Sequence, residues 1–224
     1  MNGYFVTGTD TDVGKTFVTC ALARRAVALG HRVFAFKPIE SGCAAGSEGQ
    51  LQGADQELLA AAAGNWQHGP FRGLYRFPLA AAPLVAAEAA GTAIDVDHVV
   101  RISLDGALSG HASLTLIEGA GGWRVPITQD VDIAGLARAL ALPVIVVARA
   151  GLGTINHTLL TIEAVERDGL PLVGVVMSHR PDDDPAATTR NRLEVHRRWP
   201  GLIVILARDL DVLDPLLAIV PRGT

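Results

Sequence analysis

Gly8-Thr9-Asp10-Thr11-Asp12-Val13-Gly14-Lys15-Thr16 is the stretch that decides how this chain folds. An apolar run at residues 4–6 precedes it, and a helical pattern that starts with Phe17 and Val18 follows it. A glycine-bearing loop that opens a helix with Gly-Lys-Thr is typical of a phosphate-binding loop. Glycine lets the backbone approach an anion closely, and the helix N-terminus adds free N–H donors and a positive dipole end.

The last two residues of this stretch suit a nucleotide. Lys15 would neutralise the outer phosphates, and the Thr16 hydroxyl would hold Mg²⁺ between them. The usual pattern has four residues between its first glycine and Gly-Lys, and Thr9 stands where that glycine belongs. Counted from Gly8, the loop is one residue longer. The alternative is an ordinary strand-to-helix turn with a solvated Lys15, and the flanking elements favour the phosphate site.

The composition indicates a protein with an aliphatic core. Hydrophobic residues make up 49% of the chain and aromatic residues only 5%, as suits helices packed on a parallel sheet. The net charge of −4 and the lack of a Lys/Arg-rich run argue against a nucleic-acid partner. We expect no signal peptide and no membrane span. Cys20, expected in the core, and Cys43 are expected to be reduced thiols, which favours a cytoplasmic location.

Apolar runs alternate with helical patterns along the whole chain. This pattern predicts a single α/β domain over residues 1–224, with a doubly wound, mainly parallel sheet and helices on both faces. The expected strands are 4–6, 32–36, 114–117, 143–148, 172–177 and 202–206. The expected helices include 54–63, 154–167, 209–219 and one ending near Trp199. Two more carry predicted apolar faces, Val96-Val100-Leu104-Leu108 and Ile133-Leu136-Ala137-Leu140.

Polar residues and glycine loops follow several of these strands. In open parallel sheets, ligands bind outside the carboxyl ends of the strands. Lys37, Glu118, the loop from Gly151 and Ser178 all occupy such positions, together with the phosphate-binding loop. Lys37 taken alone is more simply explained as a surface charge at a strand end, and Glu118 could simply cap a loop. His157 is more simply a structural hydrogen-bonding residue than a ligand.

Three oxygen-bearing side chains could converge on one cation. They are Thr16, Asp55 and Glu118. Mg²⁺ suits this set because it is a hard ion that needs few protein ligands besides phosphate and water. Asp55 could instead be a favourable charge in the first turn of its helix.

Four motifs together resemble the dethiobiotin synthetase family. They are residues 8–16, Lys37-Pro-Ile-Glu-Ser-Gly42, Glu118-Gly-Ala-Gly-Gly122 and Gly153-Thr-Ile-Asn-His157. The resemblance runs in order from residue 3 to about residue 177. The first motif alone is shared with related P-loop amidoligases and partition ATPases, whereas the four together are highly specific.

The resemblance implies a cyclo-ligase reaction. In this family 7,8-diaminopelargonic acid takes up CO₂ as a carbamate, ATP phosphorylates the carbamate, and the second amine closes the ring of dethiobiotin. The implied cofactors are Mg²⁺ and ATP as co-substrate. The implied assembly is a homodimer in which a helix of the second subunit completes the substrate pocket.

The resemblance also implies roles for particular residues. The catalytic set is Lys37, Lys15 and Thr11, with Lys37 on the carbamate and the transferring phosphoryl group. Substrate contacts are implied for Thr11, Lys37, Ser41, Gly153, Thr154, Ile155 and Asn156. Nucleotide or Mg²⁺ contacts are implied for Asp12, Val13, Gly14, Lys15, Thr16, Phe17, Asp55, Glu118, Gly119, Ala120, Gly121, Ser178, His179 and Ala207.

The chain departs from the family pattern at three places. Asp12 replaces the glutamate expected beside Val13, and Ser178 stands where the family often has an asparagine that reads adenine. The segment 206–208 lacks the proline common after the last strand. We therefore expect GTP and CTP to support the reaction within roughly tenfold of ATP.

Other functions compete with this interpretation. A partition-type regulatory ATPase would carry an additional lysine where Asp10 stands. A glutamine-dependent amidase would need a glutaminase domain with a nucleophilic cysteine and histidine, for which the chain is too short. A bare nucleotide-binding module would leave Lys37 and Ser41 unexplained.

Overall fold

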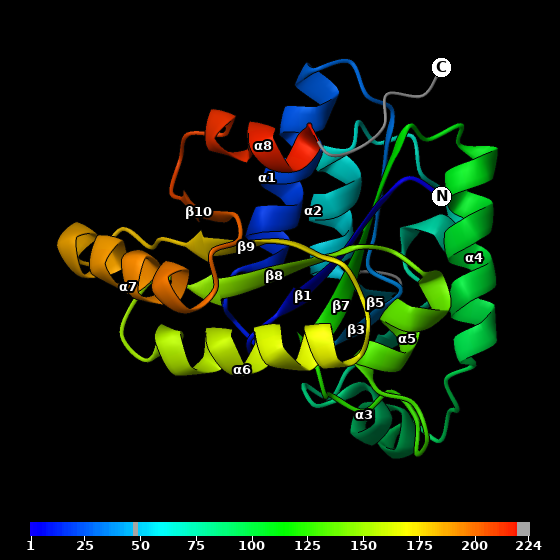
Figure 1. Cartoon of the computed structure of the whole chain (residues 1–224). Helices are drawn as coiled ribbons and strands as arrows, with labels where there is room; N and C mark the ends of the chain where they lie inside the picture. The colour runs from blue at the N-terminus through cyan, green and yellow to red at the C-terminus, as the bar shows by residue number, and fades with distance from the viewer. Residues whose placement is uncertain (47–48, 219–224) are drawn as a thin grey trace.

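A parallel sheet forms the centre of the protein (Figure 1). The computed structural model describes residues 1–46 and 49–218. Within them, the main sheet has six strands in the order β10-β9-β8-β1-β7-β2, and every neighbouring pair is parallel. The strands are β1 (Gly3–Gly8), β2 (Val33–Phe36), β7 (Leu114–Gly122), β8 (Val144–Arg149), β9 (Leu172–Ser178) and β10 (Ile203–Leu206).

Helices cover both faces of this sheet. One face carries α1 (Lys15–Ala28), α2 (Ala54–Ala62) and α8 (Asp214–Leu217). The other carries α4 (Val96–Ser109), α5 (Ile133–Leu140), α6 (Thr154–Arg167) and α7 (Pro185–Arg198), with α3 (Pro83–Ala89) packed at its edge. The predicted doubly wound α/β fold is therefore confirmed.

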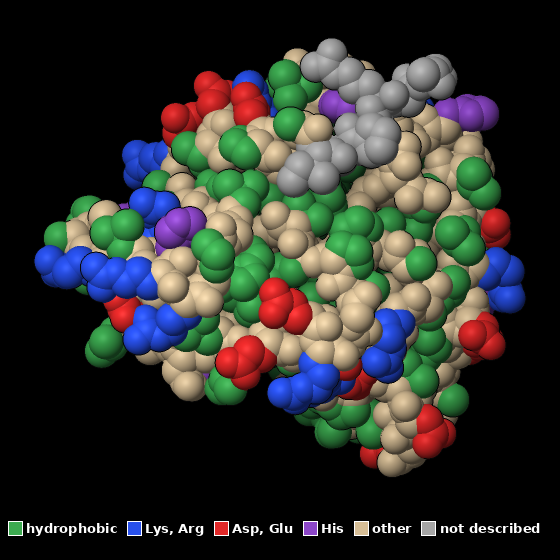
Figure 2. Space-filling view, viewed as in Figure 1, with side chains coloured by type: hydrophobic (Ala, Val, Ile, Leu, Met, Phe, Trp, Pro, Cys, Tyr) green, Lys and Arg blue, Asp and Glu red, His purple; other side chains and the backbone are tan. Residues whose placement is uncertain are grey.

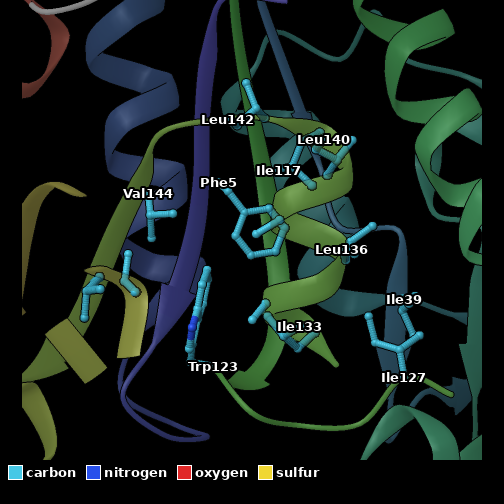
Figure 3. Close-up of a cluster of buried hydrophobic side chains, with 14 of the residues drawn as sticks. Phe5, Ile39, Ile117, Trp123, Ile127, Ile133, Leu136, Leu140, Leu142 and Val144 are labelled. Carbon is cyan, nitrogen blue, oxygen red and sulfur yellow. The ribbon is translucent and has the colours of Figure 1, made fainter. Parts of the chain in front are cut away.

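Alternate side chains of the central strand build two separate cores. Phe5 of β1 packs with Trp123 and with Ile133 of α5 on one face (Figure 3). Tyr4 and Val6, its chain neighbours, pack on the other face against α1 and α8. The alternation follows from the period of two along a strand. Because both faces are buried, β1 reads in the sequence as a continuous apolar run.

The strand order places a crevice beside β1. From β1 the chain crosses to β2, returns to β7 between them, and then continues on the opposite side of β1 with β8. The direction of winding therefore reverses next to β1. Ligands of open α/β sheets bind at such a switch point, and the loop after β1 is the predicted phosphate-binding loop.

Several short elements were not predicted. β3 (Ile39–Ser41) pairs with β6 (Tyr75–Phe77), β4 (Ala44–Ala45) pairs with β5 (Leu51–Gln52), and a 3₁₀ turn η1 covers Gly69–Arg72. The predicted helix 209–219 is wrong in its first part. A 3₁₀ turn, η2 (Asp211–Leu213), precedes α8, whose first turn contains Pro215, a residue suited to the start of a helix. Residue 219 lies outside the described residues.

The strand that carries Glu118 is longer than predicted. It continues through the glycines to Gly122, so Glu118 lies within β7 rather than after it. In β1 the pairing with β7 shifts register between Val6 and Gly8. The glycine segment therefore stays beside the phosphate-binding loop.

The surface mixes charged and apolar side chains (Figure 2). Lys and Arg gather over α7 in this view. Arg197 and Arg198 both form ion pairs with Glu194 of the same helix. Among the helices of the described residues, none has the length and apolar character to cross a membrane.

The buried face of α4 matches the predicted one only in part, because Val96 and Val100 pack against the core but the two leucines do not. Leu108 is 72% exposed and Leu104 is also exposed. The fully buried positions of the helix are instead Val99 and three small residues, Ser103, Gly106 and Ala107. They allow the helix to lie close to Phe34 of β2, since a Cβ atom on Gly106 would lie 2.3 Å from the Phe34 ring.

We predict that Gly106→Ala destabilises the protein although alanine favours helix. The added methyl would overlap the buried Phe34 ring, and such overpacking costs roughly 1–3 kcal/mol. The free energy of unfolding in urea measures this. Asp105→Ala, an exposed neighbour on the same helix, is the control and should change it by less than about 0.5 kcal/mol. An unchanged stability of Gly106→Ala would contradict the close packing.

Candidate active site

The loop between β1 and α1 forms a compact anion cradle. Asp12 and Gly14 adopt left-handed backbone angles, with φ of 53° and 96°. A Cβ atom on Gly8 would lie 2.8 Å from the Asp10 carbonyl oxygen and 3.0 Å from the Lys15 Nζ. The close approach requires glycine at position 8, which explains why the pattern counts from Gly8 rather than from Thr9.

Lys15 begins α1 and folds back over this loop. Its Nζ donates to the carbonyl oxygen of Asp10 at 2.9 Å, and the residue is 7% exposed. Burial, opposed by the attraction of Glu118 and aided by the repulsion of the Lys37 ammonium, lowers the pKa of Lys15 to about 8. The lysine has a neutral carbonyl as its hydrogen-bond partner and carries charge that an anion would stabilise.

Lys37, which directly follows β2, joins two carboxylates. Its Nζ contacts the Asp55 carboxylate and lies 3.0 Å from Glu118 Oε1. Burial opposes the charged form, but these two carboxylates raise the pKa of Lys37 above its ordinary value. Thr16 Oγ1 donates to the same Glu118 oxygen at 2.8 Å. The predicted Mg²⁺ ligands Thr16, Asp55 and Glu118 thus meet around the Lys37 ammonium.

These three residues fit a hard divalent cation. All their donor atoms are oxygens, two of them carboxylate oxygens, as Mg²⁺ prefers. Glu118 Oε2 is buried and has no hydrogen-bond partner among the described residues. Because a buried carboxylate oxygen without a partner is costly, this atom is suited to an additional positive ligand.

A cleft of about 970 Å³ lies over this cluster. Many predicted site residues line it, namely Thr11, Asp12, Gly14, Lys15, Thr16, Phe17, Lys37, Ser41, Asp55, Ala120 and Gly121. Its opposite wall is apolar and consists of residues 80–83 and Val125. Ser41 Oγ donates to the Ala81 carbonyl oxygen at 2.8 Å and so ties the two walls together. The cleft therefore has an ionic half and an apolar half.

Some predicted residues lie behind the cleft. Val13 is buried in the core, and Gly119 packs against Phe5 and Ile133. Ser178 is buried against the loop, so that a Cβ atom on Gly14 would lie 2.6 Å from its Oγ.

Other predicted residues lie beside the cleft. His179 Nδ1 is 3.2 Å from Thr188 Oγ1, and Ala207 is exposed. The start of α6 borders a separate cavity of about 90 Å³, where Gly153 and Thr154 face Thr9 and Asp10. Ile155 and Asn156 follow on the helix, and Asn156 is exposed.

Two arginines of the cleft were not predicted as site residues. Arg149, the last residue of β8, lines both the main cleft and the smaller cavity. Arg180 also lines the cleft, and its Nη2 donates to the Asp12 carbonyl oxygen at 2.6 Å. The signal for Arg149 was present, because it directly follows the apolar strand predicted at residues 143–148.

The fold and this site define a nucleotide-binding α/β protein of the P-loop class. Solved structures agree at the level of fold. The signal recognition particle receptor FtsY from Elizabethkingia anophelis matches with a TM-score of 0.55 and 14% identity, over 95% of this chain and 61% of that one. Chloroplast FtsY from Physcomitrella patens matches with a TM-score of 0.53 and 16% identity, over 94% and 60%.

Comparison of sequences gives the family. A family model described as an AAA domain matches residues 2–222. ATP-dependent dethiobiotin synthetase BioD of Anaeromyxobacter dehalogenans (strain 2CP-C) is 46% identical over 88% of this chain and 85% of its own. The protein of the same name from Marinobacter nauticus is 41% identical over 90% and 86%. The chain belongs to the family of ATP-dependent dethiobiotin synthetases.

We predict that nucleotide binding takes up a proton at alkaline pH. Because the pKa of Lys15 is lowered to about 8, the empty protein holds Lys15 neutral above that pH and charged below it. Phosphates favour the charged form, so binding at about pH 9 should take up close to one proton, and at about pH 7 almost none. Affinity should accordingly fall as the pH rises above about 8.

Calorimetry of ADP binding in buffers with different ionisation enthalpies measures this uptake. Lys15→Arg is the control, since a guanidinium stays charged throughout this pH range. Equal proton uptake at both pH values in the wild-type protein would contradict the lowered pKa of Lys15.

Proposed function

We propose that this protein is the cyclo-ligase that forms dethiobiotin from 7,8-diaminopelargonic acid, CO₂ and ATP. The observation that carries the proposal is the contact of Lys37 with Asp55 and Glu118 beside the phosphate-binding loop, in a chain of this family. A partition-type ATPase explains the loop but has no use for Lys37 or Ser41, so it is not favoured.

The reaction proceeds through a carbamate and then through its activated form, the carbamic–phosphoric anhydride. One amine of the substrate adds to CO₂ and loses a proton, which gives a carbamate. A carbamate oxygen attacks the γ-phosphorus of ATP, and ADP leaves. The second amine then attacks the carbonyl carbon of the phosphorylated carbamate and loses a proton, and inorganic phosphate leaves as the ring closes. Phosphoryl transfer of this kind depends mainly on positioning and charge neutralisation.

The residues of the cleft can supply both. Lys15 binds the outer phosphates of the nucleotide, and Lys37 neutralises the carbamate and the transferring phosphoryl group. Thr11 and Ser41 hold the amine end of the substrate. Thr16, Asp55 and Glu118 would hold Mg²⁺, which neutralises phosphate charge when bound. The apolar wall at residues 80–83 suits the hydrocarbon chain of the substrate.

We further propose that the pocket is completed by a second copy of the chain. The substrate carries a carboxylate far from its amines, and the backbone N–H groups at Gly153–Asn156 suit such a group. Leu152, next to them, is fully exposed, so its apolar side chain is free to pack against a second copy. A single domain and a cytoplasmic location remain part of this proposal, with Cys20 and Cys43 both free thiols.

We predict that Lys37→Ala abolishes synthesis but not nucleotide binding. Loss of one charge-assisted contact at the transferring group should lower kcat by on the order of a hundredfold to a thousandfold. Affinity for ADP should stay within about threefold, since Lys15 still binds the phosphates. Product formation from diaminopelargonate, bicarbonate and ATP, identified by mass, measures this.

Lys15→Ala is the matched variant, and it should lose both nucleotide binding and synthesis. The same assay with GTP and CTP in place of ATP tests the loose base selection expected from Ser178. Near-normal turnover of Lys37→Ala would refute its catalytic role, and a wild-type protein that makes no dethiobiotin would refute the proposed function.

A mixture of two inactive variants should recover activity if the pocket is shared. Lys37→Ala retains an intact α6. Asn156→Pro removes a free backbone N–H from the first turn of α6 but retains an intact Lys37, so a mixed dimer has one complete site. Random pairing of equal amounts should restore about a quarter of the wild-type activity. Turnover after mixing, compared with the average of the separate variants, measures this. A fully active monomer at every dilution would contradict it.

A further inference from the structure

A buried carboxylate outside the reacting cluster touches the helix that carries Asp55. Glu40 lies in β3 and is 7% exposed. Its Oε1 accepts from the backbone N of Asp55 at 2.9 Å, and its Oε2 accepts from the backbone N of Gln56 at 3.1 Å. Both oxygens of this side chain are thus used at the N-terminus of α2.

The helix lacks a cap of its own. Gly53 stands at the N-cap position of α2 and has no side chain to accept from the free N–H groups. Glu40 accepts from these N–H groups instead, although it belongs to a different element and lies thirteen residues earlier in the chain than Gly53. A serine or aspartate is the residue that usually accepts from these groups at an N-cap position. A cap from β3 does more, because it fixes the helix end relative to the strand.

A second buried side chain ties the same helix end to Lys37. Gln56 is fully buried, and its Oε1 accepts from the backbone N of Lys37 at 2.6 Å. Its Nε2 donates to the carbonyl oxygen of Ala35 at 3.3 Å. Glu40 and Gln56 together therefore connect the backbone of Asp55 with the backbone of Lys37, whose side chains form an ion pair.

The packing around Glu40 leaves little freedom. A Cβ atom on Gly53 would lie 2.7 Å from Glu40 Oε2. Arg76 of β6 stands opposite Glu40 in the register of the small sheet, and Cys43 donates through Sγ to the Glu40 carbonyl oxygen at 3.4 Å. The carboxylate is held in one place by backbone donors, which is the arrangement expected for a positioning group.

We propose that Glu40 is a positioning residue for the proposed synthetase reaction, holding Asp55 where it meets Lys37 and the divalent cation. Glu40 is not among the residues that line the cleft, and it acts through the start of α2. The inference rests on the proposed function, because it assigns Asp55 and Lys37 to that reaction. Groups that orient metal ligands in this way typically contribute tenfold to a hundredfold to activity or metal affinity.

Two variants disturb this contact in different ways. Glu40→Gln keeps one acceptor and loses the other, whereas Gly53→Ala keeps Glu40 and displaces its carboxylate. Gly53 has a φ of −85°, so alanine is compatible with its backbone. Glu57→Gln is the control, since Glu57 lies in the same turn of α2 but is exposed and pairs with Arg72.

We expect both variants to lower kcat by about tenfold or more while KM for ATP changes by less than about threefold. The melting temperature without ligand should stay within a few degrees, which a purely structural cap would not predict. A second readout does not use the reaction. In the presence of EDTA, ADP should raise the melting temperature of the variants as much as it raises that of the wild type. Mg²⁺ added together with ADP raises the melting temperature further, and the variants should need a severalfold higher Mg²⁺ concentration than the wild type to reach half of this increase.

The two readouts separate the possible failures. If the wild-type protein forms no dethiobiotin, the Mg²⁺ titration still decides the role of Glu40 toward Asp55. Wild-type kcat and wild-type Mg²⁺ requirement in both variants would overturn the proposal. A loss of melting temperature without a change in kcat or Mg²⁺ requirement would overturn it as well, because Glu40 would then serve the fold alone.

Discussion

A buried ammonium held between two carboxylates is the interaction on which this site depends. The Lys37 side chain is 9% exposed and that of Glu118 is not exposed at all. A charge in such a place is tolerated only when it is paired and hydrogen-bonded, and removing one partner leaves the other at a cost of several kcal/mol. Lys37, Asp55 and Glu118 therefore constrain one another, and the elements that carry them must meet at one point.

The strand order provides that meeting point. β7 lies between β1 and β2 although it follows both in the chain. Phe36 pairs with Ile117, so the next residues, Lys37 and Glu118, lie side by side. Thr16 comes from the helix after β1 on the other side of β7, and it reaches the same Glu118 oxygen. A parallel sheet with this order thus assembles the cluster from residues that are far apart in sequence.

The sequence was sufficient for those parts of the protein that have a repeated or positional signal. Continuous apolar runs predicted the main strands, and the rule that ligands bind at strand ends selected Lys37, Glu118 and the phosphate-binding loop. Strands of two or three residues, such as β3, have no period to detect. Part of the buried face of α4 was missed because Gly106 and Ser103 contribute no hydrophobic signal. Glu40 was recognised only as one residue of the motif at 37–42, because its burial depends on where α2 packs.

Two lysines share the cleft, and their surroundings give them opposite electrostatic properties. Lys37 has two carboxylates as partners, and its pKa is raised. Lys15 has the Asp10 carbonyl oxygen, and burial lowers its pKa from 10.5 to about 8. A difference of that size corresponds to a cost on the order of 3 kcal/mol for keeping Lys15 charged in the empty protein. A bound phosphate removes this cost, because it forms the ion pair with the Lys15 ammonium that no described side chain of the empty site provides. The unpaired Lys15 therefore lowers the stability of the empty protein, and the free energy regained when a phosphate pairs with it contributes to nucleotide binding.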